Sequence, residues 1–136
     1  MTPRRFLAVG VGCRSGVSGE VIADLVERAL ETCARPGVPA ALFTVVDKQS
    51  EPGIGEAAVA LGLALVHLPR AALAAVADKV ATRSEKVVEL FGVPSIAEGA
   101  ALAGAGPNGR LVVERLAERG ATVAVAIGGA SNEDEE

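Results

Sequence analysis

Short apolar runs alternate with helical patterns in the first half of the chain. The runs Phe6–Val11, Ala40–Val46 and Ala64–Leu68 are mostly apolar and end at turn or polar residues, which is typical of buried strands. After the first run, apolar residues recur at helical spacing, at Val21, Ile22, Leu25, Val26, Ala29 and Leu30. A second helix is expected from about Ile54 to Leu61. The pattern predicts parallel strands joined by right-handed helical crossovers.

The second half of the chain predicts short helices followed by strands. Helices are expected over Ala71–Val76 and Glu85–Leu90. A third begins after Ser95-Ile96-Ala97-Glu98, which has the residues of a capping box. The segment Arg110–Arg119 fits either a helix or a strand, whereas the valines of Ala121–Ile127 indicate a strand. We favour a hairpin for this last third.

These elements predict a single α/β domain of three layers, α/β/α. Its sheet is expected to be mainly parallel, with an antiparallel strand or hairpin near the C-terminus. The chain of 136 residues has the size of one domain, and its 50% apolar content can fill a core. We expect this domain to span residues 1–128. Residues 129–136 are predicted to be an acidic, disordered tail, which holds Glu133, Asp134, Glu135 and Glu136.

Charge and composition exclude several classes of function. Outside the tail, 13 acidic residues balance 13 basic ones, and the chain has no Trp and no Tyr. Nucleic-acid binding usually needs a basic face or aromatic stacking surfaces. No run of 18 apolar residues predicts a membrane span, and no signal-peptide cleavage pattern follows Phe6–Val11. Two cysteines, Cys13 and Cys33, match neither a disulfide scaffold nor a zinc site. We therefore expect a cytoplasmic protein without metal or resident cofactor, binding neither nucleic acid nor membrane.

The glycine-rich stretch Gly10–Gly19 lies between a predicted strand and a predicted helix. Its glycine spacing fits neither the dinucleotide-binding motif nor the P-loop. Unpaired N–H groups at the helix N-terminus and the charge of Arg14 suit an anion. The alternative is that the glycines only form a tight turn. The candidate ligand-binding residues of this loop are Gly10, Gly12, Cys13, Arg14, Ser15 and Gly16.

Charged residues follow the second predicted strand. The carboxyl ends of parallel strands meet at one edge of a sheet, where ligands commonly bind. There, Lys48 is suited to binding a carboxylate, and Asp47 to orienting it or acting as a base. Glu51, in the same loop, is a candidate acid or base. Equally, these residues fit an ordinary solvated loop with a local ion pair.

Other candidates have a plain structural interpretation beside the functional one. A helix N-terminus and Arg14 would both lower the pKa of the Cys13 thiol, although no histidine partner is placed by sequence. The capping box explains Ser95 and Glu98, and a ligand would meet them through the helix N-terminus that they stabilise. His67, the only histidine, fits a packed residue better than a catalytic one. The catalytic candidates are Cys13, Asp47, Lys48 and Glu51.

Four blocks of sequence, in this order, resemble one family. They are Gly10–Gly16, Thr44–Gly53, Gly92–Glu98 and Ala121–Ala126. These blocks resemble CobE and the C-terminal domain of CbiG, proteins of cobalamin (vitamin B12) biosynthesis. The likeness covers nearly the whole chain except the tail.

The resemblance implies a role in forming the corrin ring. Its expected partner is a precorrin or another tetrapyrrole intermediate, whose acetate and propionate arms suit Arg14 and Lys48. Other cobalamin-pathway enzymes are further expected partners. CbiG-type proteins open the ring-A lactone of a cobalt-precorrin. The resemblance is to the C-terminal part of CbiG and does not extend to its amino-terminal part, so we expect it to leave enzymatic activity open. The alternative is a non-catalytic phosphate- or nucleotide-binding module, or an interaction module within an enzyme complex.

Overall fold

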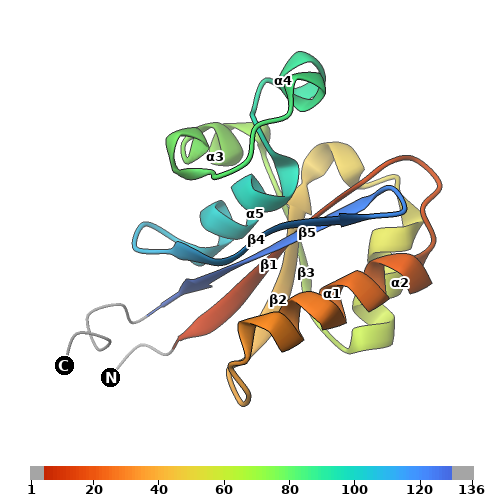
Figure 1. The fold of residues 1–136 in the computed structure, drawn as a ribbon. Coiled ribbons are helices and arrows are strands. Elements are labelled where there is room, and N and C mark those ends of the chain that lie inside the picture. The colour runs from red at the N-terminus through yellow and green to blue at the C-terminus, as the bar shows by residue number, and fades with distance from the viewer. Residues whose placement is uncertain (1–4, 130–136) are drawn as a thin grey trace.

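A mixed sheet forms the centre of the computed structural model, which describes residues 5–129 (Figure 1). Its five strands lie in the order β3-β2-β1-β5-β4. Pairings β1–β2 and β2–β3 are parallel, whereas β1–β5 and β4–β5 are antiparallel. The strands are β1 (Phe6–Cys13), β2 (Ala40–Val45), β3 (Leu65–Leu68), β4 (Arg110–Glu118) and β5 (Ala121–Gly128).

The prediction of a mainly parallel sheet is wrong. The C-terminal hairpin, itself correctly predicted, places β5 directly beside β1, so the central strand has one parallel and one antiparallel neighbour. The structure therefore shows a single α/β domain with a mixed sheet. Apart from Gly129, the predicted acidic tail lies outside the described residues.

The helices follow the predicted order, and the three whose two ends were predicted begin and end within two residues of those bounds. They are α1 (Gly19–Cys33), α2 (Pro52–Leu61), α3 (Arg70–Ala74), α4 (Glu85–Phe91) and α5 (Ile96–Ala105), with 3-10 turns η1 (Val46–Lys48) and η2 (Ala77–Lys79). Local sequence explains these limits. Ser18 accepts a hydrogen bond from the Val21 N–H at the start of α1, and Gly62 ends α2 in a left-handed conformation.

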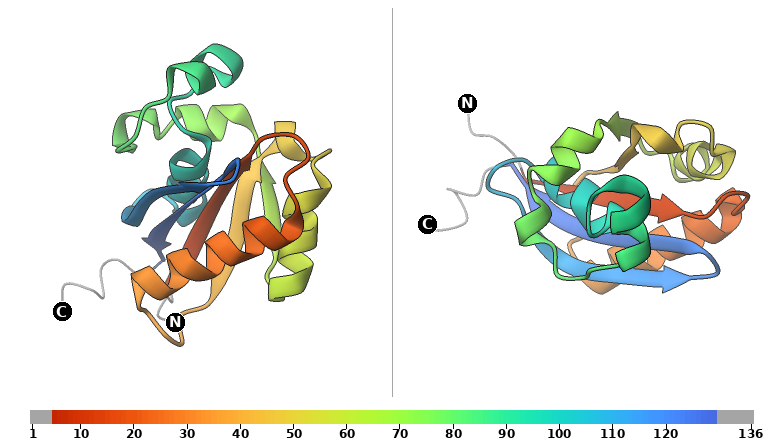
Figure 2. Two further views of the ribbon diagram at one scale, coloured as in Figure 1. Left: turned by 45° about the vertical axis from the view of Figure 1, so that its right-hand side comes forward. Right: turned by 90° about the horizontal axis from the view of Figure 1, so that it is seen from above.

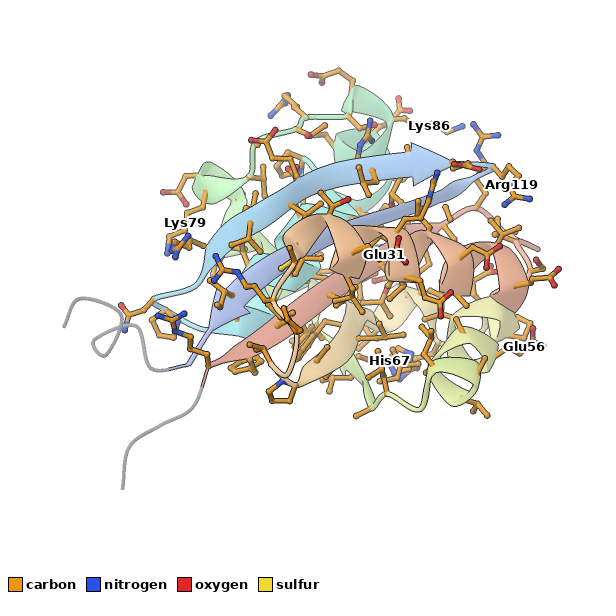
Figure 3. The ribbon with its side chains drawn as sticks, turned by 60° about the horizontal axis from the view of Figure 1, so that its bottom comes forward. Glu31, Glu56, His67, Lys79, Lys86 and Arg119 are labelled. Carbon is orange, nitrogen blue, oxygen red and sulfur yellow. The ribbon has the colours of Figure 1, made fainter. Side chains whose placement is uncertain are left out.

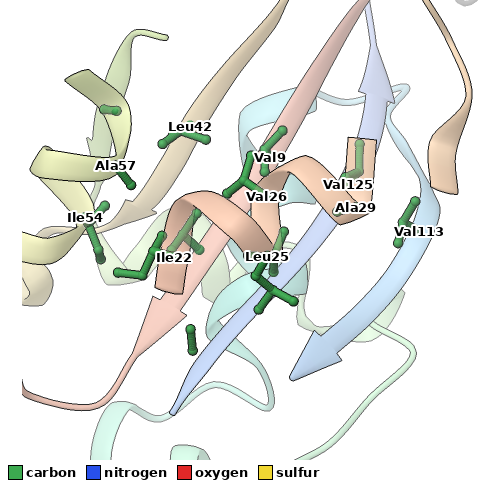
Figure 4. Close-up of a cluster of buried hydrophobic side chains, with 14 of the residues drawn as sticks. Val9, Ile22, Leu25, Val26, Ala29, Leu42, Ile54, Ala57, Val113 and Val125 are labelled. Atoms are coloured by element: carbon green, nitrogen blue, oxygen red, sulfur yellow. The ribbon is translucent and has the colours of Figure 1, made fainter. Parts of the chain in front are cut away.

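Large aliphatic side chains fill the face of the sheet that α1 and α2 cover. Residues Leu7, Val9 and Val11 of β1 point to this face. Figure 4 shows Val9 beside α1. They pack against Ile22 and Leu25 of α1, which are 0% and 1% exposed. The alternation of β1 thus buries every second residue under α1.

Small residues occupy the opposite face, beneath α5. Ala8 of β1 and Ala124 and Ala126 of β5 form a second cluster with the alanines of this helix. A Cβ atom on Gly10 would lie 1.8 Å from the carbonyl oxygen of Ala97. The sheet therefore approaches α5 with no space for a side chain at Gly10. Figure 2 shows α5 directly beside the sheet, with α4 standing further out.

The strand β4 pairs irregularly with β5. The register shifts between Leu111 and Val113, and again between Val113 and Leu116. These bulges leave residues of β4 without a partner on β5.

Among residues 5–129, no single helix is long and apolar enough to cross a membrane. In the same range, α4 and α5 taken together, which meet at a bend of 67°, satisfy that test of length and composition.

Candidate functional site

A groove of about 660 Å³ opens where β1 ends and β5 begins. The two strands meet there because Cys13 pairs with Ala121. The turn between β4 and β5 forms one wall, and α4 with the start of α5 forms the other. The Arg14 N–H donates to the Gly120 carbonyl at 2.9 Å, which ties the glycine-rich loop to this turn. The volume lies in the range of about 300–1,000 Å³ that small-molecule sites occupy.

The groove is basic. Among the described residues that line it, five are cationic and one is acidic. The acidic residue, Glu118, forms ion pairs with Arg28 and Arg119. Figure 3 shows Lys86 and Arg119 on the same side of the molecule. The five cations are Arg14, Lys48, Lys86, Arg115 and Arg119. The groove thus favours an anionic ligand.

Apolar side chains form the wall that α4 and α5 contribute. They are Val87, Leu90, Phe91 and Ile96. Leu90 is 54% exposed, which is unusual for a residue with a large aliphatic side chain. An apolar wall beside cationic residues suits a ligand that combines a flat apolar body with carboxylate arms.

Lys48 connects the end of β1 to α4. Its Nζ donates a hydrogen bond of 2.7 Å to the Cys13 carbonyl and lies 5.3 Å from the centre of the Phe91 ring. The guanidinium of Arg70 lies at the same distance from that ring. Two cations therefore contact the Phe91 ring.

Asp47 faces Arg70 and does not line the groove. The Arg70 guanidinium forms a bidentate contact with its carboxylate, at 3.1 and 2.7 Å. This hydrogen bonding lowers the pKa of Asp47 below its usual range. A carboxylate with a lowered pKa is a weaker base, so this pairing disfavours the base role suggested for Asp47.

The chain itself supplies the anion that the glycine-rich loop binds. The Glu51 carboxylate accepts hydrogen bonds from the Ser15 hydroxyl at 3.0 Å and from the Gly16 N–H at 3.1 Å. Ser18 meanwhile caps α1 internally. Among the described residues that line the groove, none belongs to α1. The predicted anion cradle is therefore closed by Glu51, and neither Glu51 nor Gly16 lies in the groove.

The expected low pKa of the Cys13 thiol is wrong. Burial raises the pKa of Cys13, an effect that Lys48 opposes and Glu51 reinforces. Cys13 is only 9% exposed, and its thiol stays protonated near neutral pH. Cys13 is thus a poor nucleophile, although it lines the groove. Gly10 cannot contact a ligand there, because α5 covers it.

Only half of the predicted capping box forms. Ser95 accepts a hydrogen bond from the Glu98 N–H at 3.1 Å, but the Glu98 carboxylate turns away from the start of α5. Its Oε1 accepts from the N–H groups of Ala81 and Thr82, at 2.9 and 2.7 Å. Its Oε2 accepts from the Thr82 hydroxyl and the Arg115 N–H, both at 2.9 Å. Fully buried, this carboxylate cannot meet a ligand.

The structure gathers part of the predicted site and leaves out the rest. The predicted residues in the groove are Gly12, Cys13, Arg14, Ser15, Lys48 and Ser95. Those outside it are Gly10, Gly16, Asp47, Glu51 and Glu98. Sequence reasoning missed the residues that α4 and the hairpin contribute, chiefly Lys86, Phe91, Arg115 and Arg119. The spacing of Val87, Leu90 and Phe91 is a signal for an apolar helix face, which is open to the groove here.

His67 lies away from the groove. It follows Leu65 by two residues on β3 and so shares the face that α1 and α2 cover. Figure 3 shows it apart from Lys86 and Arg119. Within residues 5–129, no three His, Cys, Asp or Glu side chains gather into a potential metal site.

Comparison with known proteins gives consistent results. The family described as "Cobalamin synthesis G C-terminus" matches residues 7–126. Protein CobE of Sinorhizobium sp. is 34% identical over 121 residues, which is 88% of this chain and 79% of that protein. The crystal structure of a CobE, a protein from the cobalamin biosynthetic pathway, has a TM-score of 0.84 at 30% identity and covers 90% of each chain. Cobalamin biosynthesis protein chiG of Agrobacterium tumefaciens has a TM-score of 0.68 at 38% identity, covering 88% of this chain and 96% of that one.

Proposed function

The chain belongs to the cobalamin synthesis G C-terminus family, and on this premise we propose that it binds a carboxylate-bearing corrinoid intermediate in the groove beside α4. Precorrins and corrinoids combine an extended macrocycle with several acetate and propionate arms. The macrocycle would lie against the apolar wall of α4 and α5, and the arms would meet the cationic residues.

The combination of charge and apolar surface in one groove carries this proposal. Five cationic residues line the groove together with the apolar residues of α4, among which Leu90 is 54% exposed. A simple phosphate would use the cations but not the wall. The N–H of Gly16, which a nucleotide phosphate would need in the glycine-rich loop, already bonds to Glu51. The structure therefore favours a corrinoid over a nucleotide.

The same residues favour binding over ring-A lactone opening by this chain. Hydrolysis of a lactone needs a general base or an activated nucleophile near the ester. In the described part of the groove, the carboxylate of Glu118 is held by two arginines, and the Cys13 thiol is protonated. We accordingly propose that the chain holds or delivers the intermediate, acting with other enzymes of the pathway.

Absorbance titration with hydrogenobyrinic acid tests this proposal. The chain contains no Trp or Tyr, so the ligand bands are read against little protein absorbance. Wild-type protein should shift these bands, and the affinity should fall as salt rises, because salt screens exposed charges. Replacing Arg14 and Lys86 together by Gln should weaken binding at least about tenfold, or ~1.4 kcal/mol.

A matched double variant controls for net charge. Lys79 and Arg110 lie outside the groove, and replacing both by Gln removes the same number of positive charges. This variant should bind as the wild type does. Equal loss in both variants would reject the assignment to the groove, and no binding by wild-type protein would reject the proposed function.

A further inference from the structure

The buried carboxylate of Glu98 joins segments that are distant along the chain. It lies on α5, is 0% exposed and accepts four hydrogen bonds. Two backbone donors, at Ala81 and Thr82, belong to the segment that leads into α4. A third backbone donor, at Arg115, belongs to β4. One side chain thus connects both walls of the groove.

On β4, Glu98 accepts a hydrogen bond from a backbone N–H that has no partner on β5. Val113 pairs with Val125 and Leu116 with Val123, so three steps along β4 oppose two along β5. Arg115 lies inside this bulge, and its N–H donates to Glu98. The side chain of the same residue lines the groove. Glu98 therefore determines where Arg115 stands relative to α5.

The other end holds the segment that leads into α4, a helix that packs on the domain only through partly buried residues. Its Val87 and Phe91 contact the buried cluster of Val45, Leu73, Val93 and Ile96. No residue of α4 is buried. Its segment is closed at the base by a hydrogen bond of 2.9 Å from the Ser84 N–H to the Pro94 carbonyl. At its far end, the Phe91 ring contacts the cationic groups of Lys48 and Arg70. Figure 1 shows α4 projecting above the sheet. Its position therefore depends on this packing and on the residues just before it, which Glu98 fixes through two backbone hydrogen bonds.

We propose that Glu98 is a positioning residue that sets the width of the groove by fixing α4 and the β4–β5 hairpin relative to each other. Its effect on corrinoid affinity rests on the proposed function, whereas its effect on the two walls does not. If Glu98 only stabilised the core, its substitution would increase amide hydrogen exchange in all parts of the domain alike. If Glu98 is a positioning residue, its substitution increases exchange mainly in the two walls of the groove.

Amide hydrogen exchange without ligand tests the structural part. Glu98→Gln keeps the size of the side chain but replaces one acceptor oxygen by an NH₂ group, which cannot accept the donors that face it. Exchange in residues 80–91 and 110–118 should rise about tenfold, because buried donors lose their acceptor. Exchange in α1 and β2 should stay as in wild type.

Thr44→Val provides a matched control in a buried polar residue that does not line the groove. Thr44 is 0% exposed and donates a hydrogen bond of 2.7 Å to the Val11 carbonyl. This variant should leave exchange in 80–91 and 110–118 unchanged. If Glu98→Gln does not fold, Thr82→Val removes a single one of the four bonds and should show the same local pattern, at about threefold. A uniform increase across the domain, or none in the walls, would overturn the proposal.

Titration of the same variants with hydrogenobyrinic acid separates the two proposals. Glu98→Gln should lose about tenfold in affinity, and Thr44→Val should bind as wild type does. Wild-type affinity in Glu98→Gln would overturn a role in setting the groove. If wild-type protein binds no hydrogenobyrinic acid while local exchange still rises in Glu98→Gln, the positioning of the walls is supported and only the proposed function falls.

Discussion

The two faces of the sheet come from the same strands but carry side chains of different size. Along β1, the residues Leu7, Val9 and Val11 meet α1, while Ala8 and Gly10 meet α5. Along β5, valines face α1 and alanines face α5 in the same way. One face is stabilised by the volume that its side chains bury. The other is stabilised by the close approach of a helix, which requires that side chains be small.

This contrast has a consequence for the groove. The close approach of α5 brings the start of that helix, with Ser95 and Ile96, to the end of β1. The bulky face instead supports α1, which contributes no described residue to the lining of the groove. The face of small residues thus positions the candidate site, and the face of large residues mainly supplies the core.

The largest effect is expected from adding one carbon on the small-residue face. In Gly10→Ala, the new Cβ would lie 1.8 Å from Ala97 O and 2.6 Å from Ala101 N, both backbone atoms that cannot move aside. The variant should lose more than about 4 kcal/mol of unfolding free energy, an exceptional loss for a single substitution. Urea denaturation measures it.

Gly55→Ala is the control for that variant. Gly55 lies in α2, and a Cβ there would have no neighbour within 4 Å. This change should be neutral or stabilise the protein by up to about 1 kcal/mol, because alanine favours helix. A similar loss in both variants would contradict the distinction between the two faces.

On the face of large residues, removing side-chain volume should lower the stability of the protein. Leu25 of α1 is 1% exposed in the aliphatic core. Leu25→Ala should cost about 3 kcal/mol, within the range of 2–5 kcal/mol for buried leucines. Thermal or urea unfolding would measure the loss. Val59→Ala serves as its control, since Val59 is 84% exposed and should change stability by less than about 0.5 kcal/mol.

The smallest expected effect on stability comes from the surface ion pair of Asp47 and Arg70, which belongs to neither face of the sheet. A hydrogen bond from Arg70 lowers the pKa of Asp47 below its ordinary value of 3.8. The pair therefore contributes stability above that pH, and the contribution is lost as the pH falls through the lowered pKa. In Arg70→Gln the pKa of Asp47 should rise toward 3.8. NMR titration of the Asp47 carboxyl carbon measures this change, and Lys79→Gln should leave the titration unaltered.

Local patterns were sufficient to predict most elements. The continuous apolar runs predicted β1, β2 and β3, and helical spacing predicted α1, because each of these signals depends on neighbouring residues alone. The ambiguous segment Arg110–Arg119 became a strand because β5 offered it a partner. Its bulges had weakened the alternation by which a strand is recognised.

Long-range pairing could not be predicted. Both sides of β1 are apolar, so nothing in its sequence indicates that β5, and not a parallel strand, lies next to it. Glu98 illustrates the same limit within the site. Its residue type and spacing fit a capping box, but its donors lie 16 and 17 residues away and compete successfully for the carboxylate.

Only part of the groove could be predicted, for a related reason. Lys48 and the glycine-rich loop were expected there because parallel strands end at one edge of a sheet. Lys86, Phe91 and Arg119 reach the same edge through α4 and an antiparallel hairpin, whose positions depend on tertiary contacts.

The irregular pairing of β4 affects how the protein meets its neighbours in a crowded solution. In the strand order, β3 and β4 are the two edges of the sheet, with backbone groups that another chain could pair with. The edge at β3 is only four residues long. The edge at β4 has nine residues, but its bulges bend the backbone and charged Glu114 and Arg115 interrupt it. Both edges therefore resist the strand-to-strand association that leads to aggregation.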